Sequence, residues 1–329
     1  MNSSITRWVS AITLVVLTAS AGSAVAQQYP NKPVRLIVPF AAGGALDALA
    51  RAISPKLSES LGVPVLVDNR GGAGGGIAMT ALTTAPPDGY TIGLGHSGTH
   101  SINPHLYAKP GYDALNGFTP ITPLVSYVNI LVCNPELPFK TVGELVTYAK
   151  ANPMKVSFGS GGTGTTSHLS AELLKVVTGA PIVHVPYKGG GPAMTDVLGG
   201  NISCMFDLLV TGLPQVRGGK ARGLAVTSAK RSAHAPDVPT MAESGVQGYQ
   251  EAGSDLWIGT FAPAKTPKPV IDRLHAELLK ALKAPDVAER IRAQAFDAWT
   301  LSPEEFPVFL RGDNARWGKV VKFSGARVE

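Results

Sequence analysis

The stretch VRLIVPFAAGGALDALAR, residues Val34–Arg51, determines how the rest of the chain is interpreted. Its first six residues form a short apolar run with β-branched side chains, which predicts a buried strand. Residues 46–61 carry apolar side chains at helical spacing and are followed by a glycine, which predicts a helix. The Gly43-Gly44 turn between them leaves helical N–H groups and the positive end of the helix dipole open to a ligand. The stretch therefore predicts an anion-binding turn, with a plain strand-to-helix connection as the alternative.

The N-terminal segment, residues 1–26, has the composition of a secretory signal peptide. Arg7 supplies a positive charge, residues 9–19 are apolar, and residues 24–26 (Ala-Val-Ala) form a small-residue cleavage site. We therefore expect a mature chain that starts near Gln27 and is located in the periplasm, with an uncleaved anchor as the alternative.

The charge of the chain argues against one class of partner. The sequence contains 29 lysine and arginine residues against 23 aspartate and glutamate residues, a formal net charge of +6. The basic residues are dispersed and are not interleaved with aromatic residues, so the pattern does not indicate binding of nucleic acid. It indicates a mild attraction for anions.

Two cysteines, Cys133 and Cys204, lie in apolar segments of strand-like composition. They can form a disulfide in an oxidising compartment or pack as buried free thiols, and the sequence leaves both possibilities open. Neither has the spacing of a metal site, and His96, His100 and His105 have no acidic partner nearby in the sequence. We expect no metal ion and no cofactor.

Strand, loop and helix alternate along the chain, which predicts parallel α/β sheets. Several predicted strands end in polar or glycine-rich loops. These loops are residues 41–45, 69–76, 95–101, 159–166 and 187–191, together with Asp207 at the end of another strand. Ligands of open α/β sheets bind beyond the carboxyl ends of the strands, so these loops are the candidate site.

Two extended segments, residues 118–132 and 254–261, connect an N-terminal α/β half with a central one. We therefore expect two domains that are joined by a hinge. Domain 1 comprises residues 27–129 and 253–329, and domain 2 comprises residues 130–252. Near the C-terminus, the pattern predicts separate short helices at residues 303–311 and 315–323.

The sequence GSGGTG at residues 159–164 matches the GxGxxG pattern of dinucleotide-binding sites. The acidic residue that should follow about 20 residues later is missing, because the next predicted strand ends at Tyr187 and Lys188. The favoured interpretation is an anion-binding nest at a helix start, with nearby threonine and serine hydroxyl groups.

The sequence GHSGT at residues 95–99 is similar to a nucleophile elbow, but Thr99 occupies the place of the final glycine. Ser97 with His100 remains the alternative hypothesis of a secreted hydrolase. Polar residues that line a loop are the simpler explanation. Anion-binding loops from two domains without a coherent catalytic set indicate ligand capture, not an enzyme.

Six motifs together are specific to one protein family. They are PFAAGGALDALAR (Pro39–Arg51), VDNRGGAGGG (Val67–Gly76), SGTHSINPHLY (Ser97–Tyr107), FGSGGTGTTSHLSAELL (Phe158–Leu174), VPYKGGGPAMTDVLGGNISCMFD (Val185–Asp207) and FAPAKTP (Phe261–Pro267). From about Tyr29 to the C-terminus, the chain resembles the periplasmic solute-binding proteins of the tripartite tricarboxylate transporter family, also called the Bug family.

This resemblance implies a type II periplasmic-binding-protein fold, in which two α/β domains close on a small organic carboxylate. It also implies a monomer that delivers its ligand to the membrane subunits of a tripartite tricarboxylate-type transporter. The implied ligand residues of domain 1 are Phe40, Ala42, Gly43, Gly44, Leu46, Asp47, Ser97 and His100. Those of domain 2 are Gly161, Thr163, Gly164, Thr165, Thr166, His168, Tyr187, Lys188 and Asp207.

The chain departs from the family pattern at Leu46, where a small polar residue often precedes the aspartate of the first motif. If Leu46 lines the site, its side chain favours a ligand with an apolar or aromatic body. Leu46 also fits the apolar stripe of the predicted helix, so it can instead pack against the sheet. Both possibilities remain open from the sequence.

Overall fold

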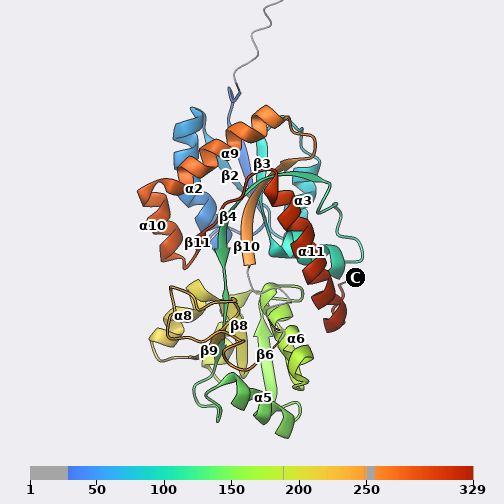
Figure 1. The fold of residues 1–329 in the computed structure, drawn as a ribbon, viewed down its shortest axis with the longest axis vertical. Coiled ribbons are helices and arrows are strands. Elements are labelled where there is room, and N and C mark those ends of the chain that lie inside the picture. Colours follow the sequence, from blue (N-terminus) through green and yellow to red (C-terminus); the bar gives the residue numbers. More distant parts are fainter. Residues whose placement is uncertain (1–28, 188, 248, 250–255, 329) are drawn as a thin grey trace, which may run out of the picture.

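The computed structural model describes residues 29–187, 189–247, 249 and 256–328 (Figure 1). The predicted signal peptide and the candidate ligand residue Lys188 lie outside the described residues, as does most of the second predicted crossing between the domains. Among the described residues, no helix combines the length and the apolar composition that crossing a bilayer requires.

The first domain is built on a six-stranded sheet with the order β11-β4-β10-β3-β1-β2. Its strands are β1 (Val34–Val38), β2 (Val65–Asn69), β3 (Thr91–His96), β4 (Phe118–Tyr127), β10 (Leu256–Pro263) and β11 (Asp297–Ala298). β1, β2 and β3 are parallel, whereas β10 is antiparallel to both β3 and β4. The sheet is therefore mixed, and the expectation of purely parallel sheets is wrong.

The second domain is built on a five-stranded sheet with the order β7-β6-β8-β5-β9. Its strands are β5 (Asn129–Cys133), β6 (Val156–Ser160), β7 (Ile182–Pro186), β8 (Cys204–Leu208) and β9 (Arg222–Val226). β6, β7 and β8 are parallel, and β5 runs antiparallel to β8 and β9. This sheet is also mixed because the chain enters the domain along β5.

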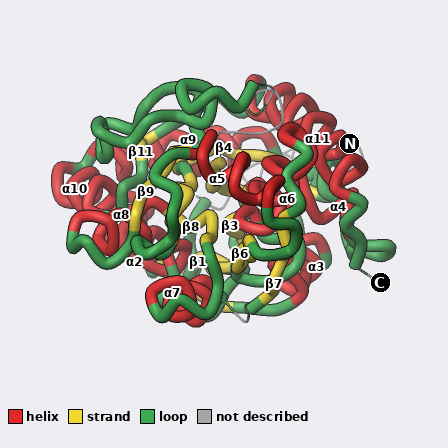
Figure 2. The backbone as a smooth tube through the Cα atoms, turned by 90° about the horizontal axis from the view of Figure 1, so that it is seen from below, coloured by secondary structure: helices red, strands yellow, loops and turns green. Residues whose placement is uncertain are grey.

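Helices cover both sheets, and the view from below shows them around the strands (Figure 2). The helical segments of the first domain are α2 (Ala45–Leu61), η1 (Ala73–Gly75), α3 (Gly76–Thr83), η2 (Gly98–Ile102), α4 (Asn103–Leu106), α9 (Lys268–Lys283), α10 (Pro285–Ala293) and α11 (Glu305–Ser324). Those of the second are α5 (Val142–Ala151), α6 (Thr166–Thr178), α7 (Gly190–Leu198) and α8 (Leu209–Arg217).

Helix α2 shows why the apolar pattern determines the fold. Its buried side chains at helical spacing are Leu46, Leu49, Ile53, Leu57 and Leu61. They belong to the same apolar cluster as the side chains of β1 and α9. Burial of this stripe stabilises the domain by roughly 1.5–3 kcal/mol for each large side chain. Gly62 ends the helix in the left-handed conformation (φ 73°), which glycine adopts without a steric penalty.

The C-terminal helix α11 is continuous over residues where two helices are predicted, so the predicted break is wrong. Gly312, Asp313 and Asn314 are weak helix formers, which suggests an interruption. In the structure, Asp313 and Asn314 are buried and bond to other parts of the domain. These tertiary hydrogen bonds override the local preference.

A disulfide joins Cys133 and Cys204, so the pairing that the sequence leaves open is formed. The two residues face each other in the antiparallel register of β5 and β8, with a Cα–Cα distance of 4.0 Å. Both side chains are fully buried. The bond crosslinks the two strands in the interior of the second domain.

Strand direction brings the carboxyl edges of both sheets to the domain boundary (Figure 1). The crossing from Tyr127 at the end of β4 to Asn129 at the start of β5 marks this boundary. β10 is antiparallel to β4, and β3 is antiparallel to β10, so β3 and its parallel neighbours β1 and β2 end at the boundary. In the second domain, β5 starts at the boundary and β8 is antiparallel to it, so β8 ends at the boundary. Its parallel neighbour β6, and β7 beside β6, end there too.

Candidate functional site

The loops that follow β1, β2 and β3 form the first wall of the candidate site. The ring of Phe40 lies 5.2 Å from the ring of His96, and the Asn69 side-chain amide donates to the Phe40 carbonyl at 3.0 Å. Beyond Phe40, residues 41–44, including the candidates Ala42, Gly43 and Gly44, are exposed. The loop is therefore anchored at its base and open at its tip.

The N-terminus of α2 has no side-chain cap, because the capping residue is Gly44. Asp47 in the first turn is buried and accepts the Gly43 N–H at 2.9 Å. It also accepts the Arg51 guanidinium at 2.9 Å, and this hydrogen bond lowers the pKa of the Asp47 carboxyl. Asp47 therefore braces the loop, while the N–H groups of Ala45 and Leu46 remain at the helix start, where an anion is favoured.

The side chain of Leu46 belongs to the core. It is only 9% exposed and lies in the apolar cluster of the first domain with Leu49. This geometry corresponds to the alternative in which Leu46 packs against the sheet. A buried Leu46 offers little apolar surface to a ligand, so it gives little support for an aromatic ligand.

Ser97 and His100 are fully buried. The Ser97 hydroxyl accepts the backbone N–H of Trp257 at 3.0 Å, so it connects the loop after β3 to β10. The His100 ring stacks on Phe261 with a centroid distance of 3.9 Å, and its Nδ1 lies 2.9 Å from the Thr99 hydroxyl. Burial holds the pKa of His100 well below its usual value. The two side chains do not form the hydrogen-bonded pair that a serine hydrolase requires.

The loop between β6 and α6 uses most of its own amide groups. The N–H groups of Gly161 and Gly162 donate to serine hydroxyls, each at 3.1 Å, and that of Gly164 donates to His168 Nδ1 at 3.1 Å. Thr165 caps α6 through the His168 N–H, Thr163 is exposed, and Thr166 is partly buried. The nest predicted from the glycine pattern is therefore largely occupied by the protein itself.

Gly164 also forms part of the contact between the domains. It is buried, its φ is +83°, and a Cβ at this position would overlap the side chain of Leu106 from α4. Helix α11 of the first domain also packs against α6. A larger residue at position 164 would disturb this contact and would not report on the ligand alone.

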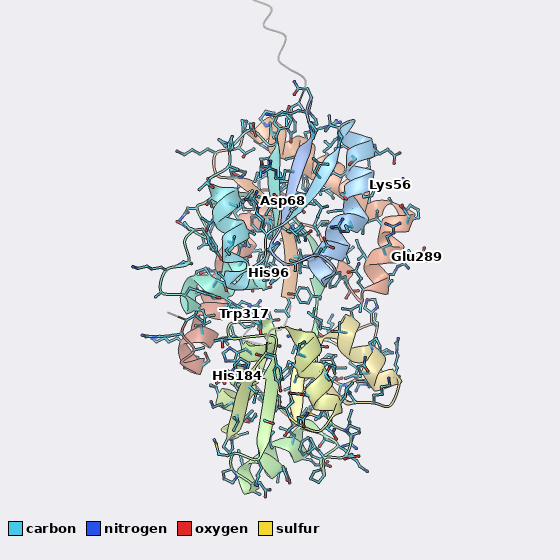
Figure 3. All side chains as sticks on the ribbon, turned by 180° about the vertical axis from the view of Figure 1, so that it is seen from behind. Lys56, Asp68, His96, His184, Glu289 and Trp317 are labelled. Atoms are coloured by element: carbon cyan, nitrogen blue, oxygen red, sulfur yellow. A yellow bond between two sulfur atoms is a disulfide. The ribbon has the colours of Figure 1, made fainter. Side chains whose placement is uncertain are left out.

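Two neighbouring histidines, with rings tilted against each other, support the same loop. The rings of His168 and His184 lie 4.0 Å apart, and burial lowers the pKa of each to about 4. His168 Nδ1 accepts the Gly164 N–H, which requires an unprotonated nitrogen. Figure 3 shows His96 and His184 on opposite sides of the domain boundary. His168 and His184 are therefore both neutral near pH 7.

The loop between β7 and α7 is more open to a ligand. The capping residue of α7 is Gly189 (φ 119°), which provides no side-chain cap. The carbonyl of Gly161 accepts the Gly189 N–H at 3.2 Å, so the β6 and β7 loops lie side by side. Pro192 in the first turn has no N–H, so the available amides are those of Gly190 and Gly191.

Tyr187 and Asp207 lie beside this helix start. The Tyr187 hydroxyl donates to Asp196 at 2.5 Å, and this bond raises the Tyr187 pKa to about 12. Asp207 is 6% exposed and accepts the Thr211 hydroxyl at 2.6 Å, and burial raises its pKa. A Cβ on Gly190 would lie 3.2 Å from the Asp207 carboxylate. Tyr187 therefore ties the end of β7 to α7, and Asp207 lies close to the first residue of that helix.

Asp313 and Asn314 on α11 are supporting residues that sequence reasoning missed. Asp313 accepts the Ser101 hydroxyl at 2.6 Å and the Trp257 indole N–H at 2.8 Å. The Asn314 amide donates to the His100 carbonyl at 2.8 Å. In the Ser101–Asp313 and His100–Asn314 contacts, the two residues are more than 200 positions apart in the chain. No local sequence pattern could therefore have identified these contacts.

In the described part of the chain, no group of three potential metal-ligating side chains lies close enough to hold a metal ion. Open hollows of about 350 Å³ and 730 Å³ lie outside the candidate site, and none of the candidate ligand residues lines them.

Comparison with known proteins identifies the family of the chain. The family model described as "Tripartite tricarboxylate transporter family receptor" matches residues 49–325. The structure of the periplasmic binding protein BugD is 37% identical, with 92% of this chain and 100% of BugD covered and a TM-score of 0.80.

Two further structures contain a ligand. Rpa4515 from R. palustris, solved with adipate, is 36% identical, with 91% of this chain and 100% of that chain covered and a TM-score of 0.83. MatC from Rhodopseudomonas palustris, solved with bound malate, is 32% identical, with coverage of 89% and 100% and a TM-score of 0.78. The chain therefore belongs to the receptor family of the tripartite tricarboxylate transporters, which is a family of solute receptors and not of enzymes.

Proposed function

We propose that this protein is a periplasmic solute-binding protein that captures a small organic carboxylate between its domains. It delivers this ligand, as a monomer, to the membrane subunits of a tripartite tricarboxylate-type transporter. The family assignment supports the receptor role, and the adipate and malate complexes of two similar proteins support the ligand class.

One observation carries the proposal. The helices α2 and α7 both have a glycine as capping residue and no side-chain cap, and both follow strands that end at the domain boundary. Each uncapped start offers backbone N–H groups and the positive end of a helix dipole. One carboxylate bound to each helix start would bridge the two domains.

This arrangement favours a short dicarboxylate over an aromatic monocarboxylate. A dicarboxylate satisfies both helix starts, whereas a monocarboxylate leaves one set of donors without an anionic partner. The buried position of Leu46 leaves the half-buried ring of Phe40 as the apolar surface at the base of the loop. That surface suits the short carbon chain between two carboxylates.

The proposed domain borders are those predicted from the sequence, with crossings near residues 127–130 and 253–256. The first crossing passes through Val128, between β4 and β5, and the second lies mostly outside the described residues. A ligand that contacts both domains favours the closed arrangement by its differential affinity for it. The proposed export to the periplasm depends on the predicted signal peptide at residues 1–26.

A calorimetric titration tests the proposed function. We expect adipate, malate or succinate to bind with a Kd of about 1 μM or tighter. Benzoate and citrate are expected to bind at least about tenfold more weakly, a difference of about 1.4 kcal/mol. Dimethyl adipate is the control, because it keeps the carbon chain without the charges. Equal affinity for the diester, or no binding of any acid, would contradict the proposal.

A further inference from the structure

A hollow of about 350 Å³ lies on the domain boundary between α8 of the second domain and the end of α10 of the first. Figure 1 shows α10 above α8 on one side of the molecule, and α11 above α6 on the other. Part of the lining is apolar, and we call the side chains of Leu209, Leu213 and Pro214 of α8 the floor of the hollow. None of the glycine-rich loops contributes to it, so it is separate from the proposed ligand cleft.

Two arginines line this hollow from opposite domains. Arg217 ends α8, and Arg292 lies in the last turn of α10. The Arg217 guanidinium donates to the His234 carbonyl at 2.7 Å, and Arg292 Nε donates weakly to the Ala288 carbonyl of its own helix at 3.4 Å. Among the described residues, neither guanidinium pairs with a carboxylate. The acidic side chain at this boundary, Asp297, instead pairs with His234 at 3.3 Å.

Both arginines are exposed and both line the hollow, so an anion held there is attracted by two positive charges. A guanidinium group presents a planar set of donors that matches a carboxylate. The apolar floor adds contact area for an organic body, as in typical small-molecule sites. We propose that this hollow is a second binding site, which takes a small organic anion with an apolar body.

The site also adjoins the connection between the domains. Leu209, in its floor, donates its backbone N–H to the carbonyl of Val128 at 3.1 Å, and Val128 is the residue between β4 and β5. Because Arg217 and Arg292 belong to different domains, the distance between them changes whenever the domains rotate. An anion held by both arginines therefore favours one relative orientation of the domains.

Benzoate is a suitable probe, because it combines one carboxylate with an apolar ring. The readout is the pair of Nε–Hε signals of Arg217 and Arg292 in nitrogen-15 correlation spectra, assigned with Arg217→Ala and Arg292→Ala. These signals come from the two guanidinium groups that line the hollow. The titration is run with the cleft filled by one equivalent of adipate, so that domain closure at the cleft does not add to the shifts. We expect both to shift saturably with a Kd of about 1 mM, and each single variant to weaken binding at least about fivefold.

The double variant Arg290→Ala/Arg311→Ala is the matched control, because it removes two exposed arginines that do not line the hollow. We expect it to bind benzoate as the wild type does, which separates local contacts from net charge. Shifts that stay unsaturated at about 20 mM benzoate would overturn the proposal. Equal affinity for inorganic phosphate would also overturn it, since the apolar floor would then contribute nothing.

Discussion

Ala45→Pro is expected to weaken dicarboxylate binding by about 10- to 100-fold without unfolding the protein. Ala45 is the first residue of α2, and proline is well tolerated at this position of a helix. The preceding Gly44 is extended (φ −82°, ψ 172°), which is the conformation favoured before proline. The substitution removes one backbone N–H from the uncapped helix start. A hydrogen bond to a charged group is worth about 1.5–3 kcal/mol, which corresponds to this loss in affinity.

Two further variants separate the amide from other effects. Ala45→Ser keeps the N–H, so it should bind within about threefold of wild type by calorimetry. Thr166→Pro makes the same change at the first residue of α6, where the preceding Thr165 is also extended (φ −71°, ψ 159°). We expect little loss there, because Thr165 already caps α6 and the proposed ligand contacts α2 and α7. A larger loss for Thr166→Pro than for Ala45→Pro would place the ligand at α6 and contradict the assignment.

Removal of the disulfide is expected to lower the free energy of unfolding by about 2–5 kcal/mol. Cys133 and Cys204 are 71 residues apart, and a crosslink over a loop of this length restricts the unfolded chain by roughly 4 kcal/mol in the entropic model. The variant Cys133→Ala/Cys204→Ala keeps small apolar side chains in the buried positions. Urea unfolding of the variant and the wild type measures the difference.

A reduced wild type is the control for side-chain packing. With dithiothreitol present, wild type and variant should unfold at similar urea concentrations. Ligand affinity should remain within about threefold, because Cys133 ends β5 at the side of the sheet away from the domain boundary. An equal free energy of unfolding for the oxidised wild type and the variant would show that the disulfide does not stabilise the folded protein.

The sequence predicts the elements of this fold better than their arrangement. The strand at residues 34–39 and the helix at 46–61 differ from β1 and α2 by one residue at one end, because local apolar periodicity determines them. The antiparallel insertion of β10 between β3 and β4 depends on contacts over more than 100 residues. No local pattern encodes such a pairing, so the sheets were expected to be parallel.

The candidate site shows the same limit. Glycine-rich loops at strand ends could be identified from the sequence, because their spacing is local. The sequence could not show which backbone amides stay available to a ligand. In the β6 loop, Ser160, Ser167 and His168 accept hydrogen bonds from these amides through their side chains. Leu46 was ambiguous for a related reason: the same spacing suits a core position and an exposed loop position, and only tertiary packing distinguishes them.

The position of a bound dicarboxylate tests the central claim most directly. A crystal structure with adipate or malate, whichever binds more tightly, is expected to show one carboxylate about 2.7–3.2 Å from the first-turn amides of α2. The other carboxylate should lie at the same distance from the first-turn amides of α7. A ligand whose carboxylates contact neither helix start, or one bound away from the domain boundary, would contradict the account.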